Sequence, residues 1–166
     1  LAIELVGALV LLPSGIAAAG SFLPGLWWAV FHSVSAFNNA GFDVVGGFRS
    51  LTPYQHAPQV LIPIAVLVIL GGLSFAVLSD VARERRWGRL TLDSKLVLSM
   101  TGALLAAGTI LVLLFEWNNP RTLGPLAWPD RVLNAFFHAV VPRTAGFNSL
   151  DLARMNDETL FVTIGL

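Results

Sequence analysis

The sequence predicts an all-α membrane protein built from repeated helical units, and three observations support this class. Hydrophobic residues make up 55 % of the 166 residues and charged residues only 12 %, whereas a soluble domain carries about 25 % charged residues. Several apolar runs have the length that crosses a bilayer. A short polar turn with the sequence Ala-Gly-Phe also occurs twice, each time after a short apolar stretch that contains a Phe-His pair.

Three apolar segments are the candidate spans. Residues 1–19 are apolar apart from a Glu and a Ser, and Pro13 predicts a kink there. Residues 60–78 contain one Ser, and residues 96–115 contain one Ser and two Thr. A bilayer core about 30 Å thick needs about 20 such residues, so each of the three is long enough, and a fourth run starts at 159. Buried helices of a large soluble protein are the weaker alternative at this low content of charge.

A basic stretch between the second and third runs predicts the orientation. Arg83, Arg85, Arg86, Arg89 and Lys95 are five of the ten Lys and Arg residues. Short loops rich in Lys and Arg stay on the cytoplasmic side of a membrane, so we expect residues 81–95 to form a cytoplasmic loop. Both Ala-Gly-Phe turns then face the outside. The stretch serves topology alone or, alternatively, also serves as a docking surface for a regulator.

The segments before the two turns are expected to be re-entrant helices. Pro24 and Pro129 suit the first turn of a helix, and Pro142 ends the second helix. A dozen helical residues reach about 18 Å, which is too short to cross the bilayer. The chain must therefore turn back at membrane depth, where irregular backbone survives only if it is buried in protein or lines a water-filled path.

We call residues 38–42 (NNAGF) the first Gly-turn and residues 143–147 (RTAGF) the second Gly-turn. Gly41 and Gly146 allow a positive φ, and the preceding helices direct their negative C-terminal ends at the turns, which favours a cation. Rings of backbone carbonyls select potassium in channels. Asn and Gly are also common in ordinary turns, but the repetition favours a pore.

The expected unit is an outer helix, a re-entrant pore helix, a filter loop and an inner helix. Residues 1–80 form one unit and residues 96–166 the next, and the two are parallel repeats around an axis along the membrane normal.

Four segments, FHSVSAFNNAGFD, ILGGLSF, LVLLFEWNNPRTLGPL and VPRTAGFNSLD, resemble the TrkH/KtrB superfamily of potassium transporters. This resemblance covers nearly the whole chain and implies the second and third of four repeats around one central pore. It implies a bacterial plasma-membrane protein that takes up potassium, works as a homodimer and is regulated by a cytoplasmic nucleotide-binding subunit. The lipid bilayer and the remaining repeats are the other partners. Ser74 departs from the glycine expected in the inner helix, and the family's gate is expected beyond Leu166.

The resemblance also implies roles for individual residues. The backbone carbonyls of two filter segments would hold dehydrated K⁺, which is the transported ion and the metal expected at these residues: Asn39, Ala40, Gly41, Thr144, Ala145 and Gly146. Four neighbours would flank and brace the filter: Asn38, Phe42, Arg143 and Phe147. No cofactor and no catalytic residue is expected.

Other ionisable residues have competing interpretations. His32 and His138 lie on the re-entrant helices, where packing is favoured over a proton relay. Asp43 either attracts cations by a long-range field or is a solvated loop carboxylate. Glu116 is expected at the interfacial end of a span, and the depth of Glu4 is open.

Other functions fit less well. An ion-coupled secondary transporter with a midplane substrate site at broken helices is the main alternative, but residues 60–78 and 96–115 contain no ionisable side chain. A membrane enzyme needs clustered His and carboxylates, and the absence of Cys excludes thiol chemistry. A net charge of zero gives no reason to expect nucleic acid.

Overall fold

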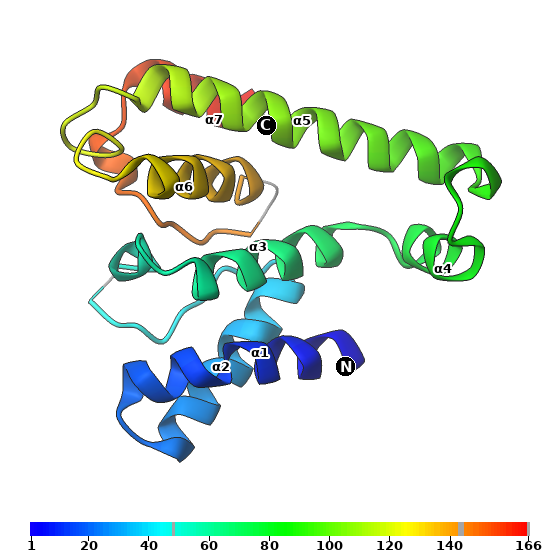
Figure 1. Ribbon diagram of the computed structural model, residues 1–166, viewed down its shortest axis with the longest axis horizontal. Helices are drawn as coiled ribbons and strands as arrows, with labels where there is room; N and C mark the ends of the chain where they lie inside the picture. Colours follow the sequence, from blue (N-terminus) through cyan, green and yellow to red (C-terminus); the bar gives the residue numbers. More distant parts are fainter. Residues whose placement is uncertain (48, 143–144, 166) are drawn as a thin grey trace.

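The computed structural model describes residues 1–47, 49–142 and 145–165, and these residues contain helices and loops but no strand. The α-helices are α1 (Ala2–Ala19), α2 (Phe22–Phe37), α3 (Pro58–Gly72), α4 (Phe75–Glu84), α5 (Leu92–Glu116), α6 (Trp128–Val140) and α7 (Asp157–Gly165) (Figure 1). Three single-turn 3₁₀ helices cover Thr52–Tyr54, Trp87–Arg89 and Leu152–Arg154. The all-helical class predicted from the sequence is confirmed for the described residues.

The length and composition of the helices make the chain an integral membrane protein. α1 and α5 are each long and apolar enough to cross a membrane, and α3 with α4 qualifies as a bent pair. Many apolar side chains of α1 and α5 point outward, among them Leu5, Leu9, Leu96, Ile110 and Leu114. A bilayer gives these side chains an apolar environment that water would not.

The second candidate span differs from the prediction. The apolar run predicts one continuous helix over residues 60–78, but α3 ends at Gly72 and α4 starts at Phe75, with a bend of 104° between them. Leu73 and Ser74 have extended ψ angles of 140° and 148°, and Ser74 Oγ accepts a hydrogen bond from Val77 N at 3.4 Å. Two glycines in succession weaken the helix, and Ser is a preferred N-cap for the next one. The apolar run hides this break because it continues on both sides.

The two halves of the chain, residues 1–80 and 96–166, lie against each other, with α3 next to α6 (Figure 1). In Figure 1, α6 runs from the edge with the long loops toward the middle of the molecule, and α2 rises from the lower edge toward the middle. In both halves the chain then returns to the edge with the long loops before α3 or α7 begins. The helix α4 and the start of α5 lie at the opposite edge, whereas the start of α1 lies nearer the middle.

Close helix contacts and a shared core hold this arrangement together. α1 crosses α2 where Gly15 and Gly25 meet, and a Cβ on Gly25 would lie only 2.6 Å from Ile16 Cα. The main core combines residues from both halves, and its fully buried members include Leu11, Leu61, Phe137 and Phe147. Packing across the halves fixes the position of one Gly-turn relative to the other.

Candidate functional site

The first Gly-turn follows directly from the C-terminus of α2. Asn39 has a φ of 51° and Gly41 a φ of 70°, and Asn and Gly are the residues that adopt this left-handed region most readily. Ala40 N donates to Ser35 O at 2.8 Å, and Ser35 Oγ donates to Phe42 O at 2.7 Å. These two bonds close the turn from both sides.

The glycine of the second Gly-turn, after α6, has nearly the same φ as Gly41. Gly146 has a φ of 72°, and Ala145 N donates to Val141 O at 3.0 Å. Ala145 and Phe147 are fully buried. The predicted filter residue Thr144 and the predicted bracing residue Arg143 lie outside the described residues.

The two turns are in direct contact. A Cβ built on Gly41 would collide with the carbonyl oxygen of Ala145 and would lie 2.7 Å from Gly146 Cα. A Cβ on Gly146 would lie 3.3 Å from Gly41 Cα. The fold therefore brings together two segments that the sequence places far apart, and it leaves no room for a side chain at Gly41.

Backbone carbonyls at this contact are unpaired within the described part of the chain. No donor among residues 1–47, 49–142 and 145–165 bonds the carbonyls of Asn39, Ala40 or Gly41, nor those of Ala145 or Gly146. Of these residues only Ala145 is buried, whereas Asn39 and Gly41 are half-buried and Ala40 and Gly146 are exposed. Carbonyl oxygens that the protein leaves unpaired and accessible can coordinate a dehydrated cation.

Aromatic and histidine side chains pack behind the turns. His32 on α2 is fully buried, and its Nδ1 lies 2.8 Å from Trp28 O. Its ring stacks on Phe147 of the second Gly-turn, with 6.3 Å between centroids. His138 on α6 hydrogen-bonds Thr163 Oγ1 of α7 at 2.9 Å. Both histidines therefore make the packing and hydrogen-bonding contacts that the sequence analysis favours for them.

The other residues near the first Gly-turn differ in how they support it. Asn38 Nδ2 donates to Glu4 Oε1 at 2.8 Å, which ties the turn to α1. Asp43 Oδ1 accepts from Val45 N at 2.9 Å, so this carboxylate caps its own loop. Phe42, which the resemblance assigns to bracing the turn, has 69 % of its surface exposed.

Glu116 is the last residue of α5, at the end of a candidate span as expected, but its side chain is fully buried within the protein, which the sequence analysis does not predict. Its Oε1 accepts from Asn156 N at 2.8 Å and from Thr159 Oγ1 at 2.6 Å, at the start of α7. Its Oε2 accepts from Asn119 Nδ2 at 2.7 Å and from Thr122 Oγ1. Four donors satisfy the carboxylate and join α5, the following loop and α7. The small polar residues at 119, 122, 156 and 159 are the signal in the sequence that could have indicated this position.

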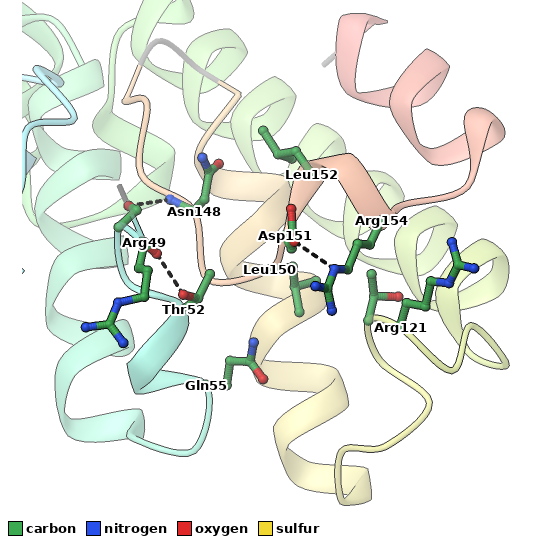
Figure 2. A pocket seen from close by; sticks show the side chains of 11 residues that line it. Arg49, Thr52, Gln55, Arg121, Asn148, Leu150, Asp151, Leu152 and Arg154 are labelled. Carbon is green, nitrogen blue, oxygen red and sulfur yellow. Dashed lines mark hydrogen bonds and ion pairs between the residues drawn. The ribbon is translucent and has the colours of Figure 1, made fainter. Parts of the chain in front are cut away.

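The loops that follow the turns join the two halves again. Leu51 N donates to Asn148 O at 2.9 Å, and Asn148 N donates to Ser50 Oγ at 3.0 Å. Beside this contact lies a cavity of about 430 Å³ that both halves line (Figure 2). Its charged side chains are Arg49, Arg121, Arg154 and Asp151, and Arg154 pairs with Asp151 at 3.0 Å. This excess of positive charge disfavours a cation inside the cavity.

Comparisons with known proteins agree with this picture. The sequence profile of the TrkH family, described as "Cation transport protein", matches residues 1–166. The chain is 41 % identical over 164 residues to "Ktr system potassium uptake protein B" of Bacillus subtilis (strain 168), and this match covers 99 % of the chain and 36 % of the relative. It is 39 % identical to "Potassium/sodium uptake protein NtpJ" of Enterococcus hirae, with the same two coverages. It is also 42 % identical to "Ktr system potassium uptake protein B" of Vibrio alginolyticus. This match covers 86 % of the chain and 31 % of the relative.

Proposed function

The chain belongs to the TrkH family of cation transport proteins, and on this premise we propose that the complete protein takes up potassium through a selective pore to which both Gly-turns contribute. The chain spans about a third of the length of the curated relatives that it matches, 36 % for the first two. The observation that carries the proposal is the contact between two left-handed turns whose carbonyls have no partner among the described residues.

In the proposed pore, the backbone carbonyl oxygens of the two Gly-turns replace part of the hydration shell of the ion. Asn39, Ala40 and Gly41 form one filter segment, and Ala145 and Gly146 belong to the other, with Thr144 as its first residue. The C-terminal ends of α2 and α6 face the turns with their negative partial charge. The ion passes without covalent chemistry, and selectivity depends on how firmly the backbone holds its oxygens.

The proposed setting follows from the same premise. The pore contains four such repeats in one polypeptide, two polypeptides form a dimer, and a cytoplasmic nucleotide-binding subunit regulates them. The protein lies in a bacterial plasma membrane with the Gly-turns toward the outside and the basic segment 81–95 toward the cytoplasm.

One observation favours a second candidate, ion-coupled transport. Glu4 places a carboxylate 2.8 Å from Asn38 Nδ2, next to the first Gly-turn, within the apolar helix α1. Intramembrane carboxylates commonly carry coupling ions in transporters. In that case Glu4→Gln would abolish uptake driven by a sodium or proton gradient, whereas a passive pore would retain uptake driven by the membrane potential.

The test is rubidium uptake into liposomes that contain the complete protein and any regulatory subunit. We expect excess potassium to block uptake far better than excess sodium does. Equal block by the two ions would retain the pore but remove its selectivity. Absence of uptake with the regulatory subunit present would contradict the pore and favour the coupled transporter.

A further inference from the structure

The side chain of Asn39 reaches from the first Gly-turn to the last turn of α3. Its amide nitrogen donates to Val68 O at 3.2 Å, and its amide oxygen accepts from Gly72 N at 3.2 Å, in the orientation that satisfies both atoms. Val68 O and Gly72 N are the two partners of one i to i+4 hydrogen bond in a regular α-helix. One side chain from the turn therefore engages both members of this pair.

The engaged pair lies immediately before the break between α3 and α4. The next backbone N–H, that of Leu73, bonds Leu70 O at 3.3 Å, which is the tighter i to i+3 pattern, and the chain then bends by 104°. A side chain that inserts into the ladder of helical hydrogen bonds is an established cause of sharp kinks. The position of Asn39 thus gives a physical reason for the place of the bend.

The backbone of α3 comes close enough for this contact because position 71 has no side chain. A Cβ on Gly71 would collide with the carbonyl oxygen of Phe37, the last residue of α2, and would lie 2.6 Å from the Phe37 carbonyl carbon. Gly72 is open by comparison, since its Cβ would meet only the side-chain amide of Asn39 at 3.6 Å. The end of α2, the turn and the end of α3 thus form one packed unit.

We propose that Asn39 is a positioning residue whose side chain ties the first Gly-turn to the break between α3 and α4, so that the direction of α4 influences the geometry of the filter backbone. This inference rests on the proposed function. There Asn39 contributes its backbone carbonyl to the filter, and here its side chain has a second role. Asparagine suits the position because it tolerates a φ of 51° and carries both a donor and an acceptor.

The decisive variant is Asn39→Gly. Glycine adopts the same positive φ without steric cost, so the backbone geometry stays accessible while both hydrogen bonds are lost. The matched control is Asn118→Gly, the same substitution at an exposed residue of the turn after α5, outside the site. We expect Asn39→Gly to lower the preference for potassium over sodium in rubidium uptake by about fivefold to tenfold. Asn118→Gly is expected to stay within about twofold of the wild type.

A second measurement reports the tie independently of transport. Spin labels at Ser21→Cys, before α2, and Ser79→Cys, on α4, report the position of α4 relative to the rest of the first unit in the complete protein. The distance distribution should be narrow in the wild type and in Asn118→Gly, and it should broaden or shift in Asn39→Gly. An unchanged distribution in Asn39→Gly would overturn the proposal even if selectivity falls.

A double-variant cycle tests the coupling itself. Ser74→Ala removes the side chain that caps α4, so it perturbs the bend from the other side. If Asn39 transmits the bend, Ser74→Ala lowers selectivity in the wild type and adds nothing in the Asn39→Gly background. If the effects of the two substitutions on selectivity simply multiply, the proposed coupling is overturned. If the wild type shows no rubidium uptake that potassium blocks, the proposed function fails, while the spin-label distances still decide whether the tie exists.

Discussion

The glycines of the two Gly-turns have nearly the same φ, but different contacts hold the two turns. The φ angles of Gly41 and Gly146 are 70° and 72°, yet Phe42 is 69 % exposed and Phe147 is fully buried. The first turn depends on polar bonds from Ser35 and Asn39, whereas Phe147 of the second turn packs against the ring of His32. The same glycine conformation thus does not require the same side-chain support, and the energetic consequences of substitution should differ between the turns.

The largest effect is expected for Gly41→Ser. Its side chain would collide with the Ala145 carbonyl and would also require a φ of 70°, which costs a non-glycine residue about 1–2 kcal/mol. Displacing the carbonyls should reduce potassium selectivity in rubidium uptake by more than about tenfold, because ligand positions determine selectivity, while membrane insertion stays nearly intact.

Gly20→Ser is the matched control for this variant. Gly20 has a φ of 71°, but a Cβ added at this position would have no other heavy atom within 4 Å. The substitution therefore carries the same backbone cost without the collision, and it should retain selectivity. Loss of selectivity in both variants would show that general destabilisation, and not the contact between the turns, is responsible.

The two phenylalanines give the next largest contrast. Phe147→Ala removes a fully buried ring from the core that both halves share, and such truncations cost about 3–5 kcal/mol. Phe42→Ala removes an exposed ring and should change the free energy of unfolding by less than about 0.5 kcal/mol. Thermal unfolding of the purified protein in detergent measures both. Equal destabilisation would contradict the asymmetry, and it would indicate that Phe42 packs elsewhere in the complete protein.

Glu116→Gln should have an intermediate effect on the second half. The NH₂ of Gln would face one N–H donor, either Asn156 N or Asn119 Nδ2, whereas the hydroxyl of Thr159 or Thr122 can rotate to accept from it. One hydrogen bond to a charged group contributes about 1.5–3 kcal/mol, and we expect a loss of about that size in the free energy of unfolding. Thr122→Val removes one donor and should cost less. A Gln variant as stable as the wild type would contradict the conclusion that Glu116 holds the start of α7 against α5.

Ser35→Ala is the smallest effect in this series. It removes the hydroxyl that donates to Phe42 O and should cost about 1 kcal/mol. A parallel Ser33→Ala variant removes a hydroxyl that bonds Glu4 O, at the contact of α1 with α2, and serves as the control. If the two variants are similarly stable and only Ser35→Ala has lower selectivity, the result supports a role of Ser35 in closing the first turn. Equal selectivity in the two variants would not support that role.

Much of the fold can be predicted from the sequence, because a membrane helix must match the thickness of the bilayer and must pair its backbone hydrogen-bonding groups. The runs 1–19 and 96–115 agree closely with α1 and α5. The break at Leu73 and Ser74 is not predicted, because apolarity continues through it and because Asn39, whose side chain contacts the end of α3, is distant in sequence. Composition reports solvent preference, whereas a kink depends on tertiary contacts.

The candidate site is predicted only at the level of the backbone. Repetition of Ala-Gly-Phe singles out Gly41 and Gly146, and the fold places them together. The buried position of Glu116 is missed because two of its four donors, Asn156 and Thr159, lie about 40 residues further along the chain. Pairings of this kind depend on the fold and leave little trace in local sequence.

The central claim is that the two turns meet to form part of one cation site, and ion-dependent thermal stability of the purified complete protein tests it most directly. A ligand that binds only the folded state raises the unfolding temperature. We predict that potassium raises this temperature more than sodium does, that both Gly41→Ser and Gly146→Ser abolish the difference, and that Gly20→Ser retains it. A potassium effect that persists in Gly146→Ser would contradict the account, because the second turn would then not belong to the site.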